Sequence, residues 1–188
     1  MVSNSPAKMV GVVLMLESPE SEKVGTALLI RSLFKGDPAE GVEHHSYARG
    51  RQVFCHGKLD PDELVGSNGH LRALARELGE EHGAEIQGLA MKNLVTEQGR
   101  PVILGNEDKG NGIEDRTYLA RIRMTLTELR RLAQTSDEVY GIQVVTNPDK
   151  IQPTNTTTHK DQGVPVGELR MSPSDILIIK EAFKREQQ

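Results

Sequence analysis

The sequence predicts a single α+β domain over residues 1–188, with a mixed, mostly antiparallel sheet of about six to eight strands and about four helices. Three observations support this fold class. Segments with alternating apolar and polar residues, typical of strands, are interspersed with segments whose apolar residues recur every three or four positions, as in helices. The length suits one domain. Neither an internal repeat nor a linker rich in serine or glycine divides the chain.

The first elements are a strand and a segment with two interpretations. The apolar run from Met9 to Leu16 has the length of a strand and predicts one that is covered on both faces. A cap, a proline and an acid at Ser18–Glu20 favour a helix over residues 19–35. A second strand over residues 24–34 is the alternative, because Gly25 weakens the helix.

The middle of the chain predicts a hairpin, a helix and a second hairpin. Residues 47–59 alternate as a β-hairpin would, and Cys55 shares the parity of its apolar neighbours. Residues 68–82 carry leucines at the spacing of an amphipathic helix. Residues 85–95 and 102–104 predict two strands joined by a turn with glycine.

The segment 117–126 shows the clearest alternation in the chain. Its even-numbered residues, from Tyr118 to Leu126, are apolar and are expected to face the core, whereas Arg121 and Arg123 lie on the other face. Thr125 and Glu128 have the spacing of a capping box, which predicts a helix over 126–134.

The last third predicts strands, loops and a C-terminal helix. Residues 139–146 and 164–170 are expected to be strands, the second of them at an edge because it contains proline. Polar stretches near 105–115 and 147–163 predict flexible loops. Residues 173–187 form an amphipathic pattern behind a serine cap, which predicts a helix.

Composition excludes several classes of protein. A net charge of −4 and 3% aromatic residues argue against nucleic-acid binding through a basic, base-stacking surface. The single cysteine, Cys55, excludes an internal disulfide and a cysteine-rich zinc site. Because no apolar run is long enough for a signal core or a membrane span, we expect a cytoplasmic protein without a membrane partner.

Residues that often carry catalysis or bind metals give no convincing pattern. Neighbouring strand residues point to opposite faces, so Cys55 and His56 are not expected to form a catalytic pair, and Cys55 is expected to be buried. The six histidines lack metal-binding spacing. We therefore expect no metal and no cofactor; His45 and His56, which could face each other across the hairpin, are the only metal candidates.

Acidic pairs and a glycine-rich segment also lack a clear chemical role. Three acidic pairs are expected to be solvated charges: Glu80–Glu81, Glu107–Asp108 and Glu114–Asp115. The segment Gly105–Gly112 lacks the Gly-Lys-Ser/Thr ending of a phosphate-binding loop.

One segment is basic inside an acidic chain. It contains five arginines: Arg116, Arg121, Arg123, Arg130 and Arg131. Arg121 and Arg123 share a strand face, so their guanidinium groups can converge on one anion or on an acidic partner. The alternative is a solvated face whose arginines pair with acids on a neighbouring element or subunit.

These observations favour a non-enzymatic structural or assembly protein that acts as a homo-oligomer through protein–protein contacts, a class that includes virion and scaffold components. The first alternative is an enzyme or binding protein for an anionic small molecule that uses Arg121 and Arg123. The second is nucleic-acid contact through the same arginines, which the net charge and the shortage of aromatic residues disfavour. The expected partner is another copy of the chain, with an acidic protein or an anionic ligand as the alternatives.

Overall fold

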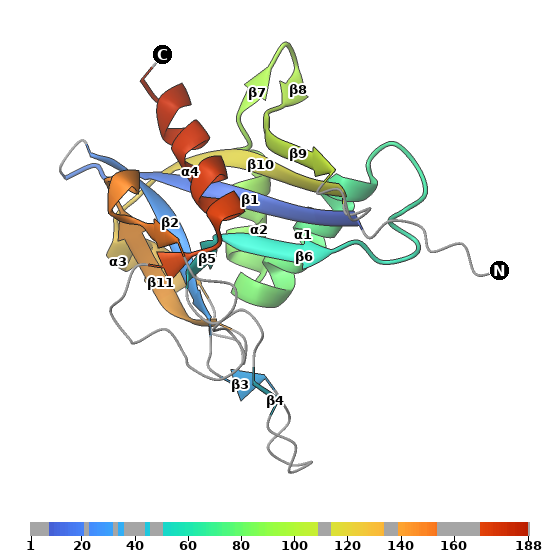
Figure 1. Ribbon diagram of the computed structural model, residues 1–188, viewed down its shortest axis with the longest axis horizontal. Coiled ribbons are helices and arrows are strands. Elements are labelled where there is room, and N and C mark those ends of the chain that lie inside the picture. Colours follow the sequence, from blue (N-terminus) through green and yellow to red (C-terminus); the bar gives the residue numbers. More distant parts are fainter. Residues whose placement is uncertain are drawn as a thin grey trace.

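The structure, a computed structural model, describes residues 8–187 except 21–22, 32–33, 36–43, 46–50, 109–113, 134–138 and 154–169. The described residues form a mixed seven-stranded sheet with four α-helices packed on its two faces (Figure 1). The α+β fold class predicted from the sequence is therefore confirmed.

The sheet is built around one buried strand. Its main path runs β11–β2–β1–β10–β9. β1 (Lys8–Glu17) pairs in parallel with β10 (Glu114–Arg123), and all other pairs in this sheet are antiparallel. The other strands on the path are β2 (Val24–Arg31), β9 (Ile103–Asp108) and β11 (Val139–Val145).

Two short strands fill the space where β2 separates from β1. β5 (Arg51–Val53) pairs with β2, and β6 (Cys55–Lys58) pairs with the first half of β1. The buried Phe54 lies at a bend between them. Because of this bend, Val53 packs into the core on one face of the sheet and Cys55 into the core on the other. The predicted burial of Cys55 is confirmed, but the parity that it was expected to share with its apolar neighbours does not hold for Val53.

The helices lie on both sides of the sheet (Figure 1). α1, α2 and α3 contribute to the core on one face, and α4 contributes to the core on the other. Alternate residues of β1 enter these two cores, which explains why its sequence is apolar without a break. The helix bounds are α1 (Gly69–His82), α2 (Ala84–Lys92), α3 (Leu126–Leu132) and α4 (Pro173–Arg185).

Smaller elements complete the described part of the chain. Three pairs of two-residue strands occur: β3 (Phe34–Lys35) with β4 (His44–His45), β7 (Thr96–Glu97) with β8 (Arg100–Pro101), and β12 (Gln152–Pro153) with β13 (Arg170–Met171). A 3-10 helix, η2, spans Pro148–Lys150. The β7–β8 pair is the hairpin turn predicted from the sequence, and Gly99 has the positive φ (76°) that such a turn needs.

Two predicted elements are wrong. The helix predicted over 19–35 is replaced by β2, which lies between β1 and β11. Gly25 is needed there because a Cβ atom would lie 2.6 Å from Val144. The strand predicted over 85–95 is mostly helix α2, since Ile86 and Ala90, four residues apart, turn the same face to the core.

The other helices agree with prediction. The helices predicted over 68–82, 126–134 and 173–187 are confirmed as α1, α3 and α4. The capping box of Thr125 and Glu128 is formed as predicted. None of the helices described here is both long enough and apolar enough to cross a membrane.

Some predictions fall on residues that the structure does not describe. These are the first arm of the hairpin with most of its turn, the centre of the loop predicted near 105–115, most of the loop predicted over 147–163, and the strand predicted over 164–170 apart from Arg170.

Candidate functional site

One arginine on α1 is enclosed by four carboxylates. Arg76 Nε lies 3.2 Å from Asp60 Oδ2, and its Nη2 lies 3.0 Å from Glu63 Oε2. Its Nη1 lies 2.9 Å from Glu77 Oε1 and 3.1 Å from Glu80 Oε2. We call these five residues the acidic cluster. When its four carboxylates are ionised, the single guanidinium leaves a net charge of −3.

Two chain segments build the acidic cluster. Glu77 and Glu80 lie on α1 itself, whereas Asp60 and Glu63 belong to the loop between β6 and α1. This loop is held in place by several hydrogen bonds. The Asp60 amide donates to Glu63 Oε2 (2.8 Å), and Arg76 Nη2 donates to the carbonyl of Lys58 (2.8 Å). The loop and the helix therefore form one polar unit.

A glycine of β6 makes room for one of these acids. A Cβ atom at Gly57 would lie 1.9 Å from Glu77 Cδ, and its carboxylate oxygens would be 2.1 and 2.2 Å away. The Glu77 carboxylate therefore lies directly on the backbone of β6. Its side chain is 14% exposed, so the acid is largely withdrawn from water.

The carboxylates of the acidic cluster do not share one electrostatic environment. The hydrogen bond from Arg76 holds the pKa of Glu63 below its ordinary value. Burial raises the pKa of Glu77, and its contact with Arg76 only partly offsets this effect. Environments that move the pKa values of neighbouring acids apart are common at functional sites, although ion-pair networks produce them too.

The acidic cluster has the donor chemistry of a magnesium or calcium site. Carboxylate oxygens are the ligands these hard cations prefer. Glu81, four residues after Glu77 on the same side of α1, is buried and adds a further carboxylate. Within the described residues, no three acidic, histidine or cysteine side chains are placed to hold an ion together. Arg76 instead contacts the oxygens of all four carboxylates of the acidic cluster.

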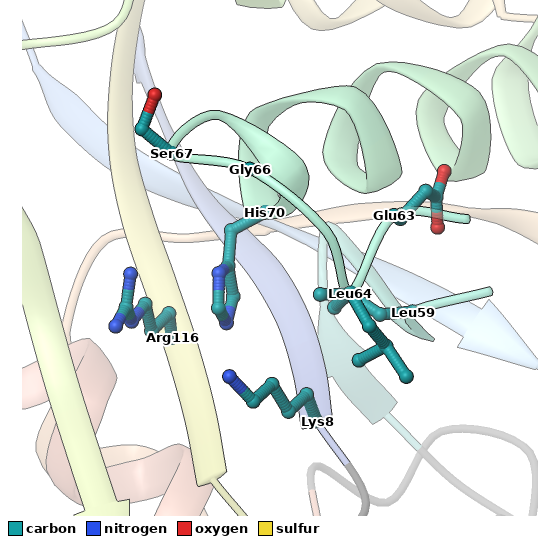
Figure 2. Close-up of a pocket in the computed structure, with 8 residues that line it drawn as sticks. All are labelled: Lys8, Leu59, Glu63, Leu64, Gly66, Ser67, His70 and Arg116. Carbon is teal, nitrogen blue, oxygen red and sulfur yellow. The ribbon is translucent and has the colours of Figure 1, made fainter. Parts of the chain in front are cut away.

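A pocket of about 220 Å³ lies at the start of α1 (Figure 2). Its wall is formed by β1, β10, the loop before α1 and the first turn of α1. The residues that line it are Lys8, Leu59, Glu63, Leu64, Gly66, Ser67, His70 and Arg116. Glu63 belongs both to this pocket and to the acidic cluster, so the two features are neighbours.

Three nitrogen-bearing side chains of the pocket surround one carboxylate. Glu114 lies 2.8 Å from Arg116 Nη2, 3.4 Å from Lys8 Nζ and 3.9 Å from His70 Nε2. Burial would raise the pKa of Glu114, but Arg116 and Lys8 together hold it below its ordinary value. Burial lowers the pKa of His70, and Arg116 adds to the effect. This shift favours the neutral form of His70.

Neither histidine candidate for a metal lines this pocket. His56 Nε2 is 2.9 Å from Asp115 Oδ2, and its ring reaches across β1 because Gly11 has no side chain. His45 lies in β4, which pairs with β3, whereas β6 with His56 pairs with β1. The expected pairing of these two histidines across a hairpin is therefore absent from the described strands.

The five arginines of the basic segment are spread over the fold. Arg121 forms an ion pair with Glu186 beyond α4, and Arg123 lies 3.8 Å from Glu17. Both arginines are exposed and pair with different acids. This agrees with the alternative in which the basic face is solvated and its arginines form separate ion pairs. The other three are also dispersed: Arg116 lines the pocket, Arg130 donates to the carbonyl of Ile142, and Arg131 is exposed. Ligand or partner contact through the five remains a prediction.

Sequence reasoning missed the acidic cluster, although a signal was present. Glu77, Glu80 and Glu81 have the i, i+3, i+4 spacing that places side chains on one side of a helix. The pair Glu80–Glu81 was expected to be solvated. This is wrong for Glu81, which is 6% exposed, and also for Asp115 in the third acidic pair.

Comparisons with known proteins point to one fold. No family model matches the chain, and neither does any curated protein. Among solved structures, a mutT/nudix family protein from Listeria innocua aligns over 96% of this chain and 94% of its own, with a TM-score of 0.53 and 17% identity. The chain has a nudix-like fold.

Two further solved structures overlap less well. The NUDIX domain of NrtR from Shewanella oneidensis, complexed with ADP ribose, aligns over 97% of this chain and 90% of its own, with a TM-score of 0.48 and 13% identity. An Ap4A hydrolase from C. elegans aligns over 74% and 80%, with a TM-score of 0.43 and 19% identity.

The fold contradicts the leading functional hypothesis from the sequence. A non-enzymatic structural protein or virion component was expected because no catalytic pattern was found. The nudix-like fold, shared over nearly the whole chain with a mutT/nudix family protein, contradicts this expectation. Of the hypotheses from the sequence, the first alternative, an enzyme or binding protein for an anionic small molecule, agrees best with this fold.

Proposed function

We propose that the protein is a hydrolase that cleaves phosphoanhydride bonds with the help of a divalent cation. The acidic cluster carries this proposal, because four carboxylates around one guanidinium leave a surplus of negative charge, and one of the four, Glu77, is largely withdrawn from water. The nudix-like fold supports it. The cytoplasmic location and the self-association expected from the sequence are retained as parts of the proposal.

Glu77, Glu80 and Glu81 are the residues that would hold the cation. They lie on one side of α1, and their oxygens suit Mg²⁺. A bound Mg²⁺ would supply positive charge to the phosphates and lower the pKa of a water molecule. Burial raises the pKa of Glu77, and a cation nearby would reverse this effect.

A hydrolysis assay tests the proposal. ADP-ribose and Ap4A, the compounds named with two of the similar structures, both contain phosphoanhydride bonds and serve as first substrates. We expect product formation that requires Mg²⁺ and is abolished by EDTA. Glu80→Gln should lower kcat by about 100-fold or more, if the metal effect is worth several kcal/mol.

The matched control is Glu85→Gln. Glu85 is an exposed acid at the start of α2 and has no contact with the acidic cluster among those described. Its activity should equal that of the wild type. Absence of Mg²⁺-dependent hydrolysis of a panel of phosphoanhydride compounds, or equal activity of Glu80→Gln and the wild type, would refute the proposal.

A further inference from the structure

The pocket at the start of α1 holds two buried nitrogens without a hydrogen-bond partner among the described residues. These are Arg116 Nε and His70 Nε2. His70 is 8% exposed and lines the pocket, and its Nε2 is 3.9 Å from the nearest Glu114 oxygen, too far for a hydrogen bond. A buried polar group without a partner is costly, so a ligand that accepts from both nitrogens would be favoured.

The charge around the pocket favours an anion. Lys8 and Arg116 are both cationic, and Glu114 neutralises only one of these two charges. Figure 2 shows the Lys8 amine close to the His70 ring, Arg116 on the neighbouring strand, and the Glu63 carboxylate apart from them on the opposite side of the pocket. Glu63 itself is paired with Arg76 and adds little free negative charge.

The number of donors distinguishes a phosphate from a carboxylate. The Glu114 carboxylate already contacts Arg116 and Lys8, but Arg116 Nε and His70 Nε2 still have no hydrogen-bond partner among the described residues. A phosphate monoester has three terminal oxygens and up to two charges, so it can accept from these nitrogens and from the Lys8 amine together. Neutral His70 can still donate one hydrogen bond from Nε2.

We propose that the pocket lined by Lys8, His70 and Arg116 binds a phosphate group. The role of this phosphate as part of the substrate rests on the proposed hydrolase function, whereas the binding itself does not. Because Glu63 lies between the pocket and Arg76, a phosphate bound there would be next to the acidic cluster. The pocket would then position one end of a substrate whose other phosphates reach that cluster.

Calorimetric titration of the full chain with inorganic phosphate, in buffer without divalent cations, tests the binding directly. We expect Lys8→Gln and Arg116→Gln each to weaken phosphate binding about tenfold, because each removes a charged hydrogen-bond donor. Arg100→Gln is the matched control, since Arg100 is an exposed arginine of β8 away from the pocket. Its affinity should equal that of the wild type.

A third variant leaves the internal ion pairs intact. Ser67 is exposed at the rim of the pocket, next to the N-terminal end of α1, where an acidic residue does not harm the helix. Ser67→Glu should therefore keep the thermal stability of the wild type and still bind phosphate more weakly. The proposal would be overturned if the wild type bound no phosphate, or if all three pocket variants bound phosphate as tightly as the wild type.

Kinetics separate this proposal from the proposed function. If the protein hydrolyses a phosphoanhydride, Arg116→Gln should raise KM about tenfold while kcat stays within about twofold, because binding is weakened without touching the acidic cluster. A wild type that binds phosphate but hydrolyses nothing contradicts the hydrolase and leaves the phosphate site supported. If Arg116→Gln hydrolyses the substrate with an unchanged KM, the phosphate bound in the pocket is not part of the substrate.

Discussion

The Glu77 carboxylate fills the space that a side chain would need at Gly57. A Cβ atom there would lie 1.9 Å from Glu77 Cδ, far inside van der Waals contact. At this point β6 contributes only backbone, and α1 contributes the largely buried Glu77 carboxylate that lies on it. This relationship fixes where the carboxylate lies in the acidic cluster, and it leads directly to a test.

We expect Gly57→Ala to fold but to lose hydrolase activity. The new methyl group must displace the Glu77 carboxylate, which is the flexible end of a long side chain, so the loss of stability should stay near about 1 kcal/mol. The matched control is Gly88→Ala in α2, where no atom lies within 4 Å of the added Cβ. That variant should be slightly more stable and fully active. Wild-type activity in Gly57→Ala would show that the position of Glu77 is unimportant.

Arg76→Met should destabilise the protein by about 2–4 kcal/mol, because it leaves four neighbouring carboxylates without their common partner. Added Mg²⁺ should restore part of this loss, since a cation that binds only the folded state stabilises it. Thermal denaturation with and without Mg²⁺ measures both effects. Arg72→Met is the control, because the Arg72 guanidinium donates to the carbonyls of Asp62 and Val65 and forms no ion pair with the acidic cluster among the described contacts. An equal response of the two variants to Mg²⁺ would contradict a cation site at the acidic cluster.

The fold could be predicted from the sequence where local and tertiary preferences agree. Helix α3 has its capping box in the sequence and in the structure. The helix predicted over 19–35 failed because its start signal, Ser18 and the residues after it, belongs to the turn between β1 and β2. There the amide of Ser18 donates to the carbonyl of Lys23. Residues 24–31 then gain partners on both sides as β2, which no local signal reveals.

The candidate site was harder to predict for a physical reason. Arg76 contacts Glu63, which precedes it by 13 residues, and the Glu77 carboxylate contacts Gly57 on another element. Such contacts depend on how the loop before α1 folds back onto the helix. The spacing of Glu77, Glu80 and Glu81 was visible in the sequence, but solvated charge is the usual fate of acids at the end of a helix.

The double variant Arg121→Lys/Arg123→Lys tests the basic segment. Both side chains are exposed, and exposed ion pairs contribute about 0–1 kcal/mol, so the free energy of unfolding should change by less than about 1 kcal/mol. If the pair contacts an anion or an acidic partner, the variant should lose that contact, because lysine cannot copy the guanidinium fork. Light scattering and phosphate titration measure this. An unchanged oligomeric state and unchanged affinity would assign Arg121 and Arg123 to a solvated face.

A buried histidine at the end of α1 should make stability depend on pH. His82 Nε2 lies 2.7 Å from the carbonyl oxygen of Phe54, and the two rings stack at 4.1 Å. The His82 side chain is fully buried. Burial lowers the pKa of His82 from 6.5 to about 4, although the hydrogen bond to Phe54 acts in the opposite direction.

The sign of the pH effect follows from this shift. Between pH 6.5 and about 4 the unfolded chain binds a proton at His82 and the folded chain does not, so the free energy of unfolding must fall as the pH falls. At about 1.4 kcal/mol per pH unit, the loss over this range is about 3 kcal/mol. His82→Gln removes the titrating group, and chemical denaturation of both proteins at pH 7, 6, 5 and 4.5 isolates its part. Stability that falls equally in both proteins over this range would mean that carboxylates alone govern it and that His82 is protonated in the folded state.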